Sequence, residues 1–418
     1  MQKKKNILST LRACCKLAAV PLLMAVVLPN WAQAAQLTTL LDFDGNNGAY
    51  PDSTWVLDGA GSLYGTAKGL GYAGSVLKLS PPAPEYTAWT LTRLSKFNSP
   101  SDGYQPGPLL QGQDGNWYAV TVSGGTNGVG TIFRLAPPAV GQTKWTRTTL
   151  FNFDSTQAPL SSARLLRDKS GNLYGTTFDG GAGHGGSVFR LAPPAAGKKG
   201  WTLSTLVNFN GTNGTLPFGG LIMDASGNLY GTTWWGGVDD DGTVFRLSPP
   251  AVGQSEWVLT TLVDFDGTHG NFPVAGLVAD KVGHLYGTTT RGGANGLGTV
   301  FKLSPPLPGK TTWRLTTLAD FTATSGHYPF APLLRDASGN LYGTAFIGGA
   351  DDDFGTVFKL SPPVTGQTAW TLATLVDFDG TNGKSPFAGL VRDALGNLYG
   401  ATNSGGQYGF GTVFKVSP

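Results

Sequence analysis

Apolar and polar residues alternate over short stretches along most of this chain, and Gly, Pro or Asn bounds each stretch. No window keeps the 3.6-residue apolar spacing of an amphipathic helix, so the pattern predicts an all-β protein. One representative unit contains four such stretches, which we name strands a to d. They cover residues 220–223, 229–232, 242–247 and 257–265, and a tight turn at 224–227 joins strands a and b.

This unit recurs along nearly the whole chain. Its strand-b tyrosine appears seven times, at steps of 54, 56, 56, 56, 56 and 57 residues: Tyr64, Tyr118, Tyr174, Tyr230, Tyr286, Tyr342 and Tyr399. Four short antiparallel strands repeated seven times are typical of a seven-bladed β-propeller, which is the fold we predict. We number the blades 1 to 7 in the order of these tyrosines.

The two ends of the repeated region predict how the ring closes. Residues 37–43 form an isolated strand d, and residues 411–416 form a strand c whose own strand d is missing. Together they complete one blade and cover strand edges that would otherwise be exposed. An open solenoid is the alternative, but it needs capping units and does not explain the split repeat.

We therefore predict one propeller domain over residues 35–418. Its repeat units lie near residues 36–44 plus 385–418, 51–98, 105–154, 159–210, 216–266, 272–322 and 328–379.

The first 34 residues have the pattern of a secretory signal peptide. A basic start precedes a short apolar core at residues 17–28, and small residues at 32–34 offer a cleavage site near Ala34. We expect a secreted protein, extracellular or periplasmic, that is not inserted in a membrane after cleavage. An uncleaved anchor is the alternative, although the apolar core is short for a membrane-spanning helix.

Removing this segment changes the charge and cysteine arguments. Cys14 and Cys15 both lie in it, so we expect no disulfide and no thiolate metal site in the mature chain. The net charge falls from +3 to −2, because 24 basic and 26 acidic residues remain. The basic pI therefore gives no reason to expect a nucleic-acid partner. We expect a monomer.

Two repeated residue types have a structural interpretation. An aspartate opens the a–b turn in six blades, and its side chain can accept hydrogen bonds from backbone N–H groups of that turn. These are Asp58, Asp168, Asp224, Asp280, Asp336 and Asp393. A tryptophan begins strand d, and we expect it to pack beneath the Pro-Pro segment of its own blade, with a sugar-binding platform as the alternative. These are Trp89, Trp145, Trp201, Trp257, Trp313 and Trp370.

The repeated phrase also resembles a known family. The tandem D-x-x-G-N-L-Y-G-T-T-x-x-G-G followed by G-T-V-F-[RK]-L-S-P-P is similar to the GloVer tandem repeat of secreted bacterial proteins with a choice of C-terminal anchor. The resemblance covers essentially the whole mature chain. It implies a secreted, propeller-like repeat protein and brings no catalytic residues. No sorting signal or hydrophobic tail follows residue 416, so surface attachment through such an anchor is not expected.

We therefore look for functional residues at the positions where the seven repeat copies differ. The b–c loops and the d-to-a loops should emerge on one face of the ring, and loops on a rigid scaffold commonly hold binding residues. The b–c loops vary most among the copies. They supply our candidate ligand-binding residues, which are Trp234, Trp235, Asp239, Asp240, Asp241, Arg291, Asp351, Asp352, Asp353 and Tyr408.

The acidic loops raise the question of a metal. We expect no cofactor, with bound Ca²⁺ as the alternative, at Asp239 and Asp241 or at Asp351 and Asp353. The phrase Asp-x-Asp-Gly at 264–267 resembles half of a Ca²⁺ loop, but a full site needs six to eight oxygens.

Motifs of catalysis are missing from the sequence. It contains no G-x-S-x-G elbow and no P-loop, and its four histidines lack metal-ligand spacing. Two functions remain. The first is a non-catalytic binding or scaffold module for an extracellular glycan, peptide or protein. The second is an extracellular polysaccharide hydrolase or lyase that uses loop aspartates.

Overall fold

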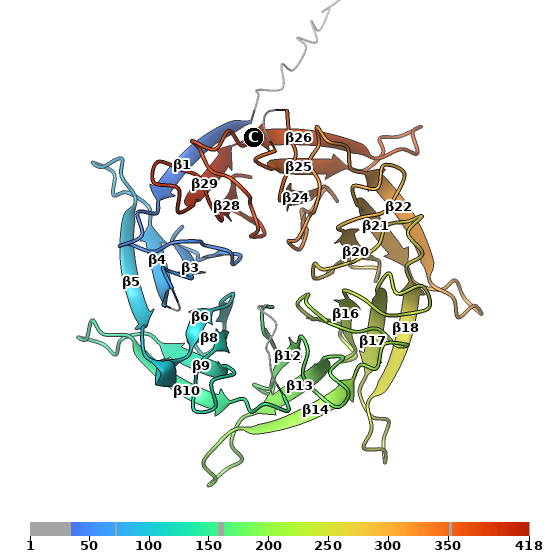
Figure 1. The fold of residues 1–418 in the computed structure, drawn as a ribbon, viewed down its shortest axis with the longest axis horizontal. Coiled ribbons are helices and arrows are strands. Elements are labelled where there is room, and N and C mark those ends of the chain that lie inside the picture. The colour runs from blue at the N-terminus through green and yellow to red at the C-terminus, as the bar shows by residue number, and fades with distance from the viewer. Residues whose placement is uncertain (1–34, 72, 158–162, 351–352, 418) are drawn as a thin grey trace, which may run out of the picture. The chain divides into compact units, whose positions relative to one another are not determined.

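Seven antiparallel β-sheets stand around a ring in the computed structural model (Figure 1). It describes residues 35–71, 73–157, 163–350 and 353–417. The predicted all-β, seven-bladed propeller is confirmed. Its described residues contain a single 3-10 turn, η1 (Pro100–Asp102), and they include no helix that is long and apolar enough to cross a membrane. The predicted signal peptide lies outside them.

Each blade runs from a short inner strand a to a long outer strand d. The seven a strands have two residues each: β2 (Val56–Leu57), β7 (Leu110–Gln111), β11 (Leu166–Arg167), β15 (Ile222–Met223), β19 (Val278–Ala279), β23 (Leu334–Arg335) and β27 (Val391–Arg392). The b strands are buried along most of their length: β3 (Leu63–Ala67), β8 (Trp117–Ser123), β12 (Leu173–Thr177), β16 (Leu229–Thr233), β20 (Leu285–Thr289), β24 (Leu341–Ala345) and β28 (Leu398–Thr402).

The c strands carry the buried residues of the phrase T-V-F in blades 4 to 7 and of its variants S-V-L, T-I-F and S-V-F in blades 1 to 3. They are β4 (Gly74–Ser80), β9 (Thr131–Ala136), β13 (Ser187–Ala192), β17 (Thr243–Ser248), β21 (Thr299–Ser304), β25 (Thr356–Ser361) and β29 (Thr412–Ser417). The d strands form the outside of the ring: β5 (Thr90–Phe97), β10 (Thr146–Asn152), β14 (Thr202–Asn208), β18 (Val258–Asp264), β22 (Arg314–Asp320), β26 (Thr371–Asp377) and β1 (Gln36–Asp42).

In blade 4 the bounds of strands b, c and d lie within one residue of those predicted, and two other features differ more. Strand a of blade 4 is Ile222–Met223 instead of residues 220–223, because Gly220 and Leu221 precede the ladder and line the centre of the ring. Blade 2 contains an additional strand, β6 (Tyr104–Pro106), which pairs with β8. The repeat pattern did not predict it, because no other blade has a counterpart among the described strands.

The ring closes as predicted. Strand β1 pairs antiparallel with β29, from Gln36 opposite Ser417 to Asp42 opposite Thr412, so the two ends of the chain share blade 7 (Figure 1). Blade 7 also contacts blade 1. The backbone N–H of Gly389 donates a hydrogen bond to Oγ1 of Thr54, with 2.9 Å between the nitrogen and the oxygen. The last blade thus has no unpaired outer edge on its c strand.

Phenylalanine pairs fill the space between neighbouring blades. Phe265 follows strand d of blade 4, and its ring centroid lies 5.3 Å from that of Phe301 in strand c of blade 5. Both rings are almost fully buried. The ring of Phe301 lies against Gly287 of strand b, where an added Cβ would stand 2.6 Å from its Cζ atom. This close approach explains why the phrase L-Y-G-T contains a glycine.

The strand-d tryptophans pack between blades. The ring of Trp313 contacts that of Tyr230 in the preceding blade, with centroids 6.3 Å apart in an edge-on arrangement. Both side chains belong to the apolar cluster between blades 4 and 5. The tryptophans pack against other side chains, as expected. These ring contacts are made with the preceding blade, whereas we expected contacts with the Pro-Pro segment of the same blade. Sequence spacing alone does not show which neighbouring blade an outer-strand residue will face.

The aspartate of the a–b turn is structural. Oδ1 of Asp224 accepts the N–H groups of Ser226 and Asn228, and Oδ2 accepts the side chains of Asn228 and Tyr230. Blade 2 lacks this aspartate at the first turn position. There Asp114 supplies the carboxylate from two residues further on and accepts the hydroxyl of its own blade's Tyr118 at 2.7 Å.

The substitution Asp224→Ala should destabilise the fold. It leaves the hydroxyl of buried Tyr230 and two turn N–H groups without their acceptor, which costs about 1–3 kcal/mol of unfolding free energy. Chemical denaturation measures the change. The matched control is Asp239→Ala on an exposed loop, where we expect a change within about 0.5 kcal/mol. Equal effects of the two substitutions would contradict this role.

The same turns predict how stability depends on pH. Burial, together with the carboxylate of Asp224, raises the pKa of Tyr230 to about 12. Burial also disfavours ionised Asp224, but hydrogen bonds from Asn228, Tyr230 and Ser226 outweigh it and lower its pKa. Stability from the carboxylates should therefore be lost as the pH falls below about 4, and stability from the tyrosines as it rises from about 10 to 12. Thermal unfolding measured as a function of pH shows both losses of stability. In Tyr230→Phe the melting temperature should fall less steeply as the pH rises from about 10 to 12. An unchanged slope would argue against this role of the tyrosines.

Candidate functional site

Two sets of loops meet on one face of the ring, which we call the loop face. In several blades the loop that leads into strand a forms a backbone bridge with the b–c loop of the same blade. These bridges pair Thr215 with Trp235, Asn271 with Arg291, His327 with Ile347 and Lys384 with Ser404. The prediction that the b–c and d-to-a loops share a face is therefore confirmed.

The residue before the repeated proline has an unusual backbone on this face. At six equivalent positions a non-glycine residue has φ between 51° and 58°: Tyr50, Gln105, Leu216, Phe272, Tyr328 and Ser385. The N–H of Phe272 donates to the carbonyl of Asp241 in the preceding blade, and its carbonyl accepts the N–H of Thr290 in its own blade. Such a backbone costs about 1 kcal/mol or more, and here hydrogen bonds to two blades hold it. The side chain at this position differs from blade to blade.

Aromatic rings from blades 3 to 5 form one contiguous row on the loop face. The ring of Phe178 lies 5.9 Å from Phe218 and 6.0 Å from Trp234, measured between centroids. The ring of Trp235 lies 6.1 Å from that of Trp234 and 4.9 Å from that of Phe272, and it is 38% exposed. The structure thus places the two predicted tryptophans, which are adjacent in the sequence, in one row with three phenylalanines that sequence reasoning missed.

The row continues through blades 5 to 7. The guanidinium of Arg291 lies over the ring of Tyr328, 5.5 Å from its centroid. Tyr328 stacks on Phe330 at 6.2 Å, and Phe330 stacks on Phe387 at 5.1 Å. The predicted Arg291 is exposed, so its charge and the partly buried aromatic rings occupy neighbouring positions on the same face. We call the residues from Phe178 to Phe387 in these two paragraphs the aromatic arc.

A channel of about 430 Å³ lies at the centre of the ring. The residue after the repeated proline lines it in several blades, as Phe218, Val274, Phe330 and Phe387 do. Leucines next to or within the a strands, such as Leu165 and Leu221, complete the apolar wall. The aromatic arc therefore reaches the channel through its phenylalanines. Sequence reasoning missed the channel, although the variable positions on either side of the repeated proline were visible.

Two charged side chains line this channel among the described residues, Asp52 and Arg164. Asp52 makes an ion pair with Lys68 at 2.7 Å. Arg164 is exposed where it lines the channel, while partial desolvation by the surrounding protein lowers the pKa of its guanidinium. None of the ion pairs between described residues includes Arg164. The channel thus combines an apolar wall with one unpaired guanidinium.

The predicted acidic candidates have varied surroundings. Oδ1 of Asp240 accepts the N–H of Gly236 at 2.8 Å, and Oδ1 of Asp241 accepts the side chain of Asn271 at 3.1 Å. Asp239 and Asp353 are exposed, and so is Tyr408 in the b–c loop of blade 7. Asp351 and Asp352 lie outside the described residues. Within the described part of the chain, no group of three or more His, Cys, Asp or Glu residues could hold a metal ion. The expectation of no cofactor, with bound Ca²⁺ as the alternative, stays a prediction.

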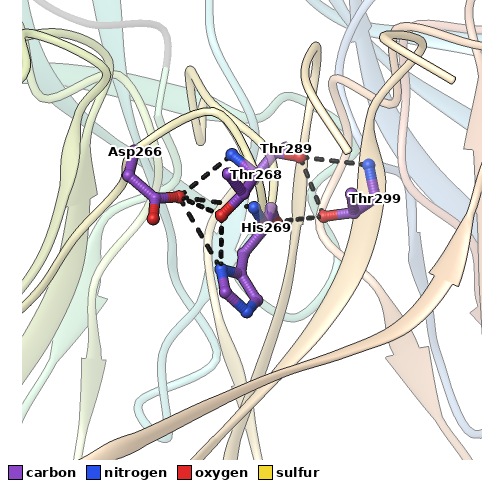
Figure 2. A network of polar contacts seen from close by, with 5 residues as sticks. All are labelled: Asp266, Thr268, His269, Thr289 and Thr299. Atoms are coloured by element: carbon purple, nitrogen blue, oxygen red, sulfur yellow. Dashed lines mark hydrogen bonds and ion pairs between the residues drawn. The ribbon is translucent and has the colours of Figure 1, made fainter. Parts of the chain in front are cut away.

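The two carboxylates of the phrase Asp-x-Asp-Gly accept hydrogen bonds from different loops. Oδ1 of Asp264 accepts the N–H of Val238 in the b–c loop. Oδ1 of Asp266 accepts the N–H and the hydroxyl of Thr268, which hold the pKa of Asp266 below its ordinary value (Figure 2). The two carboxylates therefore shape separate turns, which the linear resemblance to half of a Ca²⁺ loop could not show.

His269 adds an imidazole to this turn. Its Nδ1 lies 2.9 Å from Oγ1 of Thr268, and its carbonyl accepts the hydroxyl of Thr299 (Figure 2). A catalytic triad would need the carboxylate to orient the imidazole, which in turn contacts the nucleophile. Here Asp266 accepts the threonine hydroxyl directly at 2.7 Å and lies 3.6 Å from the imidazole. This geometry is that of a hydrogen-bonded turn.

Comparison with known proteins shows what this chain is similar to. A sequence model described as the Gloeobacter/Verrucomicrobia repeat matches residues 69–279 and 251–418. Comparison with curated proteins gives no match.

Three solved structures are distantly similar. PorZ, described as a surface component of the type-IX secretion system of Porphyromonas gingivalis, is 14% identical, with a TM-score of 0.51 over 90% of this chain and 47% of its own. A luciferin-regenerating enzyme is 14% identical, with a TM-score of 0.42 over 80% of this chain and 97% of its own. A putative oxidoreductase (glucose dehydrogenase) from Thermus thermophilus is 13% identical, with a TM-score of 0.44 over 92% of this chain and all of its own. At these identities the likeness concerns the fold alone.

Proposed function

Because the chain belongs to the Gloeobacter/Verrucomicrobia repeat family, a family of tandem repeats that here build a propeller, we propose that it is a secreted binding module whose loop face holds an extracellular glycan. The observation that carries this proposal is the aromatic arc, which runs across blades 3 to 7 where the repeat copies differ most.

The chemistry of the arc suits a sugar chain. One face of a pyranose ring presents C–H groups, which pack on the flat face of an indole, while its hydroxyls need hydrogen-bonding groups at the edge. Trp235 offers a partly exposed indole, and exposed Asp239 and Arg291 stand in the b–c loops of blades 4 and 5. The hydrogen-bonded backbone of Phe272 holds this surface in place before binding, which reduces the entropy lost on association.

Secretion is part of the proposal. Its support is the signal-like pattern of residues 1–34 and the description of the fold neighbour PorZ as a bacterial surface component. We propose that the mature chain acts outside the cytoplasm, as a scaffold that binds its partner without changing it.

The alternative, a polysaccharide hydrolase or lyase, has less support. It needs two carboxylates free to act on one glycosidic bond. Asp240 and Asp241 already accept hydrogen bonds within the loops, and Asp351 and Asp352 lie outside the described residues. We therefore place binding ahead of turnover.

The substitutions Trp235→Ala and Arg291→Ala should each weaken retention on a glycan array by about tenfold or more, because each removes a side chain from the centre of the arc. The matched control is Tyr86→Ala, which removes an exposed aromatic residue from the c–d loop of blade 1 on the opposite face. The control should bind like the wild type.

Three outcomes would contradict the proposal. Binding only to surface proteins on the same array would make the ligand a protein. Glycan binding that survives both substitutions would move the site elsewhere. Shortening of the bound glycan during incubation, measured by chromatography, would favour the enzyme.

A further inference from the structure

The inner rim of the propeller has one exceptional position. Directly before the first core residue of strand a, the other blades carry small or uncharged residues, among them Thr54, Pro108, Gly220 and Gly276. Blade 3 carries Arg164 there, and the Arg164 side chain lines the central channel. The backbones come close at this level, because a Cβ on Gly220 would lie 3.5 Å from the carbonyl oxygen of Arg164. A long charged side chain at this position is therefore not required for packing.

Arg164 makes no ion pair among the described residues, in contrast to the following two arginines. Arg147 pairs with Asp102 and Arg167 pairs with Asp114 at 3.1 Å. The other charged side chain of the channel, Asp52, is already neutralised by Lys68. The exposed guanidinium lies beside the apolar wall of the channel, and an anion that accepts two of its N–H groups can pair with its charge there.

We propose that the central channel binds a small monocarboxylate with an apolar body. Its carboxylate pairs with Arg164, and its aryl or acyl body lies against Phe218, Phe330 and Phe387. The site shares these phenylalanines with the aromatic arc, but Arg164 is not part of the arc, so either proposal can fail without the other.

Three features of the channel select this ligand class. Its volume of about 430 Å³ falls within the range of small-molecule pockets, roughly 300–1,000 Å³. The aromatic and aliphatic wall favours an apolar body and penalises a second polar group that would stay unpaired. A single guanidinium matches a single negative charge, and a planar carboxylate accepts from it in the bidentate geometry that arginine favours.

The test uses two probes that share one aromatic ring system, the anionic 1-naphthoate and the neutral 1-naphthalenemethanol, and measures their binding to the full chain by fluorescence. We expect one naphthoate to bind per chain, about 10- to 100-fold more tightly than the alcohol, as a charge-assisted bond allows. Arg164→Gln should abolish this preference, with no effect on the alcohol. Arg164→Lys should keep part of it. Phe330→Ala should weaken both probes.

The control variant is Arg314→Gln, which removes an exposed arginine from outer strand β22 and should leave both probes unaffected. Equal binding of the acid and the alcohol to the wild type would overturn the proposal without any variant being needed. Failure of naphthoate to bind, or binding that Arg164→Gln leaves unchanged, would also overturn it. Retention on the glycan array should be the same for Arg164→Gln as for the wild type, which separates this test from that of the loop face.

Discussion

The fold depends on a phenylalanine that packs between each blade and the next. The phenylalanine that follows strand d leaves its own blade and, in six blades, packs on a phenylalanine of the next, as Phe265 does on Phe301. In blade 5 a glycine in strand b makes room for the second ring. Burying rings of this size stabilises each interface by several kcal/mol, on the order of 1.5–3 kcal/mol for each side chain. Such a phenylalanine pair joins the neighbouring blades from blade 1 to blade 7.

Because this packing holds the blades together, most side chains of the loop face are not needed for the stability of the fold. The a–b turns repeat almost without change, because their aspartates satisfy buried hydroxyl and amide groups. The b–c loops are held by backbone bridges and by the aspartate or asparagine that ends strand d, so most of their side chains can vary at little cost. Trp235 and Arg291 are side chains of this kind, and Arg291 contacts Tyr328 of a d-to-a loop.

Much of the fold was predictable because it is periodic. The strand-b tyrosines and the split repeat predicted seven blades and their closure through β1 and β29. The candidate site was predictable only in part. Trp234, Trp235 and Arg291 were predicted as candidate binding residues, but Phe272 and Arg164 were not expected in the site at all. The aromatic arc and the channel are built from segments about 56 residues apart, and only the closed ring brings these segments together. Blade 2 adds a local case, in which Asp114 replaces the usual aspartate from a shifted position.

The central claim is that the repeats build the ring and their exceptions bind the ligand. Hydrogen exchange of the full chain, with and without the glycan that it retains, tests this most directly. The account predicts slower exchange in the loops of the arc, at residues 234–242, 268–273, 290–298 and 324–330. It predicts no change in the a–b turns such as 224–228. Protection confined to the a–b turns or to the c–d loops, such as 249–257, would contradict the account.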